Sequence, residues 1–382
     1  MKLTSEQRDS RILVIYLRII KFFAISLILG SQARPQSNDL STKSPDKDTI
    51  TIAAVGDIML GSNFPSEAFL PPDDGATLLA PVREFLGNTD ITFGNSEGTF
   101  LDSGGILKKV ENPKNLFAFR QPRRYAKYLV DAGFTLVNIA NNHSGDFGDR
   151  GRISTTETLD SVGLYYAGLI DKPYTIFKKG GIKYGFCGFA PNSGTADIRD
   201  IEQARRIVSM LDSVCDVVIV SFHGGAEGEG HTHVKKTTEI YLGENRGDVY
   251  RFAHAVIDAG ADVVFGHGPH VTRAIELYKD RFIAYSLGNF CTFGQFELSG
   301  KCGIAPIVRL HIDRTGKFLD GRIIPIKQVG DGGPIPDPDS AAIKEIQKLT
   351  RSDFPSTPLT INDAGMILRK KELPESFYNK AR

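Results

Sequence analysis

Acidic, amide and imidazole side chains follow several short apolar runs of this sequence. They are Asp57, Asn95, Glu97, Asn142, His143, His223, His267 and His270. Carboxylate oxygens and neutral imidazole nitrogens suit Zn, Mn or Fe rather than metals that prefer thiolates. A pair of such ions can activate a water molecule and neutralise charge on a phosphoryl group. The residue types therefore predict a site that holds divalent metal for phosphoester-type chemistry.

Each of these residues also has a simpler explanation. Asp57, after a strand and a glycine, could cap a helix. Asn95 and Asn142 could occupy turns, and a lone histidine such as His223 is more often structural than a ligand. His267 and His270 stand three apart in Gly-His-Gly-Pro-His, a segment with little packing rationale. Because the simpler explanations would have to coincide at four strand ends, we favour one metal site.

The remaining histidines are expected to lie outside this site. His231 and His233 belong to a glycine-rich loop, for which we favour a position away from the metal, although contact with metal or substrate is an alternative. His254 on a helical face and His311 in a late strand are predicted to be structural.

The chain alternates apolar runs with segments of helical period from Thr49 onward. Strands are expected at 50–55, 91–93, 136–140, 217–222, 263–265, 306–312 and 322–326, with hairpins at 174–189 and 275–286. Helices are expected at 77–86, 123–132, 153–161, 201–211 and 249–259. This order predicts an α/β domain with a mixed sheet rather than a simple doubly wound fold, and two stacked sheets with helices outside are one arrangement that fits. Ligands of open α/β sheets bind beyond the carboxyl ends of strands, where the polar clusters would meet.

The two ends of the chain differ from its body. Residues 1–33 combine basic residues with a short apolar stretch and Ser31-Gln32-Ala33, which predicts a signal peptide or an uncleaved signal anchor. Residues 34–48 are polar and predict a disordered linker. We place the folded domain at 49–330 and a C-terminal helix and tail at 331–382. Both explanations of the N-terminus predict an exported protein, either secreted or held at the membrane.

Charge and cysteine content restrict the function further. The 46 basic and 45 acidic residues give a net charge of +1, so we expect no nucleic-acid partner. None of the four cysteines forms a C-x-x-C pair, which argues against a thiolate zinc site. Cys291 and Cys302 could close a disulfide in an exported chain, or all four could be ordinary buried thiols.

Six motifs occur in order along the body of the chain. They are Ala54-Val-Gly-Asp-Ile-Met-Leu-Gly61, Phe93-Gly-Asn-Ser-Glu-Gly98, Asn138-Ile-Ala-Asn-Asn-His143, Ser221-Phe-His-Gly-Gly225, Gly260-Ala-Asp-Val-Val-Phe-Gly-His-Gly-Pro-His-Val271 and Ala284-Tyr-Ser-Leu-Gly-Asn-Phe290. Together they resemble the bacterial CapA family of capsule and poly-γ-glutamate biosynthesis proteins, which is similar to the calcineurin-like metallophosphatases. The resemblance implies a four-layer αββα sandwich.

The resemblance also implies roles for individual residues. Asp57, Asn142, His223 and His267 or His270 correspond to metal ligands, and His143 takes the place of a histidine that assists the leaving group. Met59 stands where the phosphatases have a histidine, and Asn95 and Glu97 replace a bridging aspartate. Gly224 and Gly268 stand where CapA relatives often have tryptophan and histidine. We therefore expect one metal, or a rearranged pair.

The predicted function combines these inferences. We expect metal binding by Asp57, Glu97, Asn142, His223, His267 and His270, acid–base chemistry by His143, and substrate binding by Asn95, Asn141 and Arg273. The cofactor would be Mn, Zn or Fe. The partners would be an anionic envelope polymer or its precursor and membrane-bound synthase subunits. The protein would be either a phosphoesterase-like enzyme or a non-catalytic component that binds or exports the polymer.

Overall fold

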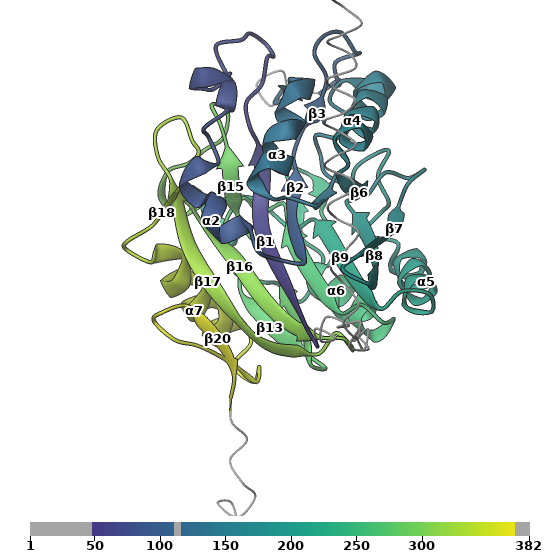
Figure 1. Ribbon diagram of the computed structural model, residues 1–382, viewed down its shortest axis with the longest axis vertical. Coiled ribbons are helices and arrows are strands. Elements are labelled where there is room, and N and C mark those ends of the chain that lie inside the picture. The colour runs from purple at the N-terminus through teal and green to yellow at the C-terminus, as the bar shows by residue number, and fades with distance from the viewer. Residues whose placement is uncertain (1–47, 111–115, 371–382) are drawn as a thin grey trace, which may run out of the picture. The chain divides into compact units, whose positions relative to one another are not determined.

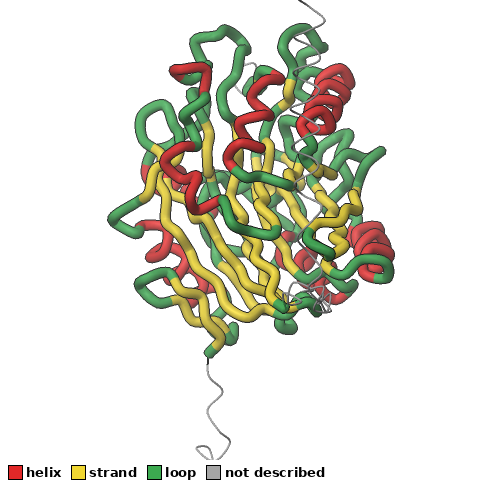
Figure 2. Tube along the Cα trace, in the orientation of Figure 1, coloured by secondary structure: helices red, strands yellow, loops and turns green. Residues whose placement is uncertain are grey.

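The computed structural model describes residues 48–110 and 116–370, and its centre is a pair of mixed β-sheets (Figures 1 and 2). The expected export segment, nearly all of the expected linker and the end of the C-terminal tail lie outside the described residues. Within the described ranges, no helix has the length and apolar character needed to cross a membrane.

The first sheet contains β1, whose polar end carries Asp57. In order across the sheet its main strands are β19 (Leu359–Ile361), β20 (Met366–Arg369), β17 (Phe318–Gln328), β16 (Ile304–Asp313), β1 (Thr49–Met59), β2 (Ile91–Ser96), β5 (Leu136–Asn138) and β6 (Tyr165–Ala167). Two short strands join it, β15 (Asn289–Thr292) beside β1 and β18 (Pro334–Pro336) beside β17. Strands β1, β2, β5 and β6 are parallel, so their carboxyl ends meet at one edge.

The second sheet brings the later histidines to the same region. Its order is β13 (Ile275–Tyr278), β14 (Arg281–Ala284), β12 (Val263–His267), β9 (Val217–His223), β8 (Ile182–Phe189) and β7 (Tyr174–Lys179). Strands β9 and β12 are parallel, and His223 pairs in register with His267. Two small two-stranded sheets stand apart, β3 (Thr99–Phe100) with β4 (Arg120–Gln121) and β10 (Ile240–Tyr241) with β11 (Glu244–Asn245).

Most helices cover the outer faces of the sheets (Figure 1), whereas α7 (Ala341–Asp353) packs against strands of both sheets and adds Ile343 and Ile346 to the core between them. The others are α2 (Arg83–Leu86), α3 (Ala126–Ala132), α4 (Gly148–Val162), α5 (Ile201–Asp212) and α6 (Val249–Asp258), with short 3-10 turns η1 (Pro72–Gly75), η2 (Ala80–Val82), η4 (Arg123–Tyr125), η5 (Glu229–His231) and η6 (Gly300–Gly303). Asp200 and Asp248 cap α5 and α6 by accepting hydrogen bonds from Gln203 N and Arg251 N. The expected helix at 77–86 is shorter, because only η2 and α2 form there.

Three apolar cores separate four layers. The first lies between the sheets and includes Ile52 of β1 and Phe265 of β12. The second joins the outer face of the first sheet to helices such as α3, through Val137 and Leu129. The third joins the second sheet to α5 and α6. The two stacked sheets with outer helices, the αββα sandwich, are therefore confirmed.

An irregularity in β1 sets the direction of the Asp57 side chain. The pairing of β1 with β2 shifts register between Ala54 and Asp57, as at a β-bulge, which redirects side chains at a strand end. Gly56 makes this possible, because a Cβ atom there would lie 1.9 Å from the carbonyl oxygen of Gly288. That close approach allows Asp57 N to donate to Gly288 O at 2.9 Å.

Candidate metal centre

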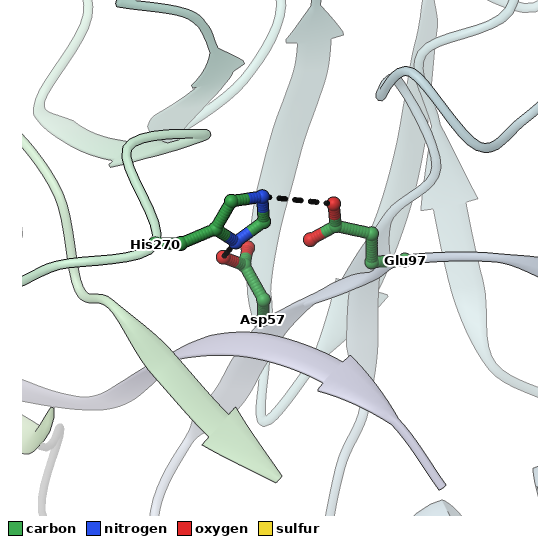
Figure 3. A group of neighbouring side chains, drawn as sticks. All are labelled: Asp57, Glu97 and His270. Carbon is green, nitrogen blue, oxygen red and sulfur yellow. Dashed lines mark hydrogen bonds and ion pairs between the residues drawn. The ribbon is translucent and has the colours of Figure 1, made fainter. Parts of the chain in front are cut away.

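Two carboxylates and one imidazole meet where the strand ends converge. His270 lies between Asp57 and Glu97, with one ring nitrogen turned toward each acid (Figure 3). Its Nδ1 is 3.1 Å from Asp57 Oδ2, and its Nε2 is 3.6 Å from Glu97 Oε1. One ligand atom from each of the three residues lies within 4.8 Å of the others, which is compatible with a shared metal ion. His270 has a φ of 56°, an uncommon conformation for a residue with a side chain.

Five buried side-chain atoms of the expected ligand set form no hydrogen bond within the described residues. They are Glu97 Oε1, Asn142 Oδ1, His223 Nε2, His267 Nδ1 and His267 Nε2. Glu97 Oε1 and His267 Nδ1 have only longer ionic contacts, of 3.4–3.8 Å. Glu97, His223 and His267 are fully buried. Leaving a buried polar group unpaired costs about 1–3 kcal/mol. All five atoms are of the kinds that bind Zn, Mn or Fe, so the donor set fits a divalent metal.

Asn95, in the first sheet, contacts both acids and also His223 of the second sheet. Its Nδ2 donates to Asp57 Oδ1 at 2.8 Å and lies 3.4 Å from both Glu97 Oε2 and His223 Nδ1. Its Oδ1 accepts from Asn138 and Asn141. Because the amide side chain is held on both ends, Asn95 and Asn141 position the acids in the metal-free protein. His267 also belongs here, with Nδ1 3.4 Å from Asp57 Oδ1.

His143 stands at the edge of the cluster on a network of its own. Its Nδ1 donates to Asp146 Oδ2 at 2.8 Å, and Lys108 Nζ lies 2.6 Å from Asp146 Oδ1. The other nitrogen, Nε2, is 3.8 Å from Glu97 Oε1. Phe119 stacks on the imidazole with ring centroids 4.1 Å apart. These contacts fix the ring and leave Nε2 facing the cluster.

The protonation states of the cluster depend on burial and on close charges. Burial alone would raise the pKa of Asp57, but contacts with His267 and His270 outweigh it and hold that pKa well below its usual range. Burial and the charge of Asp57 raise the pKa of Glu97 well above normal. Burial opposes the charge on His270, yet Glu97 and Asp57 raise its pKa to about 10. At neutral pH the metal-free cluster therefore contains an Asp57 carboxylate and a His270 imidazolium.

For His143 and His223, burial lowers the pKa of the imidazole. It lowers the pKa of His143, although Asp146 partly compensates. Burial and the charge of Arg246 lower the pKa of His223 well below its ordinary value. Both rings are neutral at pH 7, as a metal ligand or a general base must be.

Two glycines that differ from the CapA pattern contact each other. Gly268 has a φ of +109°, and a Cβ atom there would lie 2.8 Å from Gly224 N. Gly224 N in turn donates to His267 O. The backbones that follow β9 and β12 thus meet closely beside His223 and His267, which leaves no room for a side chain at Gly268. At Gly224 a Cβ atom would instead lie 2.8 Å from the carbonyl oxygen of Arg246. Met59 is buried, and its sulfur accepts a hydrogen bond from Gly61 N.

Arg273 and four histidines are engaged elsewhere. Arg273 is fully buried, and its guanidinium donates to both oxygens of Glu239 and to the carbonyls of Ala226 and His231. His233 pairs with Asp353, His254 with Glu276 and His311 with Asp320. The ring of His231 packs edge-on against Tyr241. All four cysteines are free thiols.

The sequence reasoning missed three residues that organise the site. They are Asn138, which supports Asn95, Asp146, which holds His143, and Asn289, whose Oδ1 lies 3.0 Å from His270 Nδ1. Asn138 and Asn289 stand inside motifs already recognised. Asp146 stands three residues after His143, a spacing that could have suggested a carboxylate–imidazole pair.

The chain belongs to the family described as bacterial capsule synthesis protein PGA_cap, which it matches over residues 51–294. This range includes every residue of the cluster described above. The resemblance to CapA proteins is confirmed, and so is the αββα sandwich that it implied.

Two curated relatives have similar length. The chain is 26% identical over 353 residues to the capsule biosynthesis protein CapA of Bacillus anthracis, covering 87% of this chain and 79% of that protein. It is also 26% identical over 337 residues to the PGA biosynthesis protein CapA of Bacillus subtilis (strain 168), covering 83% and 82%. A solved structure of a putative 5'-nucleotidase from Staphylococcus aureus has a TM-score of 0.42 at 13% identity, covering 79% of this chain and 58% of that one.

Proposed function

We propose that this protein is an exported, metal-dependent hydrolase of the phosphoesterase type that acts in the synthesis of an anionic capsule polymer such as poly-γ-glutamate. The relatives named for capsule and PGA biosynthesis support the pathway. The chemistry rests on one observation: ligand atoms of Glu97, His223 and His267 are buried beside the Asp57 carboxylate without a hydrogen bond within the described residues. A purely structural cluster would not leave so many acceptors and donors unpaired.

Asp57, Glu97, Asn142, His223, His267 and His270 would hold Zn, Mn or Fe, as one ion or a rearranged pair. The bound metal would supply an activated water molecule and offset charge on a phosphoryl group. His143 would exchange a proton at Nε2, because Asp146 already engages its Nδ1. Asn95 and Asn141 would keep the acids in position. The natural partners would be the polymer or its precursor and membrane-bound synthase subunits.

The proposal is tested by metal content and hydrolysis of the purified full chain. After incubation with Mn²⁺, Zn²⁺ or Fe²⁺ and removal of free ions, mass spectrometry should find at least one bound ion per chain. Cleavage of bis(p-nitrophenyl) phosphate should appear with the metal and disappear with a chelator. A chain that retains no ion and leaves the diester intact would contradict the proposal.

Metal binding should release protons, because the pKa of His270 is raised to about 10 and that of Glu97 is also raised in the metal-free protein. Ligands must be deprotonated, so the affinity for metal should rise with pH between about 6 and 9. Calorimetric titrations in two buffers with different ionisation enthalpies measure the number of protons released. Equal heats in both buffers, together with an affinity that does not depend on pH, would show that neither residue ligates the metal.

A second function, binding or export of the polymer without catalysis, is favoured by a different observation. The Asp57–His270 ion pair and the hydrogen bonds of Asn95 and Asn289 already hold the cluster together without a metal. In that case the metal-free full chain would bind the polymer, remain inert on phosphodiesters and be recovered with synthase subunits.

A further inference from the structure

A cleft separate from the metal centre lies between α4 and the segment that follows β3, two elements that neighbour each other in Figure 1. Its volume is about 600 Å³, within the range of small-molecule sites. One wall is a stripe of α4, with residues Arg150, Ile153, Ser154 and Glu157. The spacing of three and four residues places these side chains on a single helical face.

Arg150 is the free cation of this cleft. It is exposed, and no hydrogen bond or ion pair engages its guanidinium within residues 48–110 and 116–370. The group lies over Gly104, where a Cβ atom would be 2.8 Å from Arg150 Nη1. The absence of a side chain at Gly104 therefore leaves room for the guanidinium at the cleft wall.

The other charges of the cleft already have partners. Arg123 donates from Nε to Thr158 and from its backbone N to Asp102, and it lies 3.8 Å from Glu157. Glu157 is thus paired with Arg123, while Asp102 accepts from a backbone N–H and keeps its charge. Within residues 48–110 and 116–370, neither acid lies within ion-pair distance of Arg150. An uncommitted guanidinium favours a ligand with an anionic group.

Two further side chains define what else the ligand should carry. Ser154 is 7% exposed, and its hydroxyl forms no hydrogen bond within the described residues. This hydroxyl, in the same wall as Arg150, can donate or accept a hydrogen bond. Ile153 is 57% exposed on the same stripe, and Leu101 opposite is buried. An anionic group on a short aliphatic stem would satisfy Arg150 and Ser154 and cover Ile153.

Both walls of the cleft belong to segments that follow residues of the metal centre in the sequence. Leu101 follows Glu97 by four residues, and Arg150 follows His143 by seven. Phe100 N donates to Thr155 of α4, which ties the two walls together.

We infer that this cleft is a second anion-binding site, which takes a carboxylate or phosphate borne on an extended substrate. The inference rests on the proposed function only for the choice of an anionic polymer as the ligand. Binding in the cleft itself requires no metal and no hydrolysis.

The test is calorimetric titration of the metal-free full chain with two probes, a short γ-linked glutamate oligomer and inorganic tripolyphosphate. Loss of a charge-assisted hydrogen bond should weaken binding about tenfold or more in Arg150→Ala. Ser154→Ala should weaken it less. Ile153→Ser should weaken the oligomer alone, because tripolyphosphate has no aliphatic stem. The probe affected by Arg150→Ala identifies the anion as carboxylate or phosphate.

Arg205→Ala is the control, since Arg205 is a half-exposed arginine on α5 paired with Glu202 and its loss changes the net charge equally. If Arg150→Ala binds both probes with unchanged affinity, the inference is overturned. It is also overturned if Arg205→Ala loses as much affinity as Arg150→Ala. If Asp57→Asn weakens binding of the probes and Arg150→Ala does not, the anion binds at the metal centre, and this result also overturns the inference. The two proposals can also fail separately. If the protein does not cleave the phosphodiester, but Arg150→Ala weakens binding of the glutamate oligomer, the proposed hydrolysis is refuted and anion binding in the cleft is supported.

Discussion

Asp57→Asn should abolish metal binding and hydrolysis while the fold remains intact. Asp57 is fully buried and contacts Asn95, His267 and His270, so it is the charged centre of the cluster. Asparagine keeps the shape but removes the negative charge. Because loss of outer-shell partners alone weakens metal sites about 10–100-fold, loss of a ligand should weaken binding by roughly 100-fold or more. Metal titration and phosphodiester cleavage measure both effects.

Asp131→Asn is the matched control, since Asp131 is an exposed acid on α3 that pairs with Lys127. It should bind metal and cleave the diester as the unchanged protein does. Circular dichroism and the midpoint of urea unfolding confirm that both variants fold. If Asp57→Asn retained its metal with unchanged affinity, the ion would have to lie elsewhere and the assignment of the centre would fail.

Asp146→Asn should reduce turnover without removing metal. Asp146 accepts a hydrogen bond from His143 Nδ1 at 2.8 Å and so selects the tautomer whose Nε2 faces the cluster. An amide can donate to Nδ1 and stabilise the other tautomer. Acid–base catalysis contributes about 10²–10⁴-fold, so kcat should fall by roughly 100-fold or more.

The pH profile separates this role from simple loss of structure. Asp146 raises the pKa of His143, so its neutralisation lowers that pKa further, and the limb of the profile set by His143 should move to lower pH. Asp149→Asn is the control, because Asp149 is 90% exposed and pairs with Arg152 on the same helix. A normal kcat in Asp146→Asn, or a loss of metal equal to that of Asp57→Asn, would rule out the positioning role.

Much of the fold followed from local patterns. Short apolar runs placed β1, β9 and β12, and glycines ended α3 and α4 because Gly133 and Gly163 adopt positive φ. The hairpins of β7–β8 and β13–β14 formed where short polar turns interrupt apolar runs. These features depend on a few neighbouring residues, so the sequence alone determines them.

The sequence also determined which residues gather at the site. Asp57, Glu97, His223, His267 and His270 follow strands whose carboxyl ends share an edge, and topology then brings them together. It did not determine the hydrogen bonds between them. The contacts of Asn95 with Asp57, and of His143 with Asp146, depend on side-chain directions set by the β1 bulge and by the turn before α4.

Tertiary structure decided the contacts of Arg273. The sequence analysis expected this arginine to bind substrate, and the fold buries its guanidinium in an ion pair with Glu239, so substrate binding by Arg273 stays a prediction. The reverse holds for Arg150, which no motif marks and which the packing of α4 against β3 leaves unpaired at a cleft. Ion pairs between segments distant in sequence depend on the distances between side chains in the folded protein. Those distances cannot be obtained from local sequence patterns.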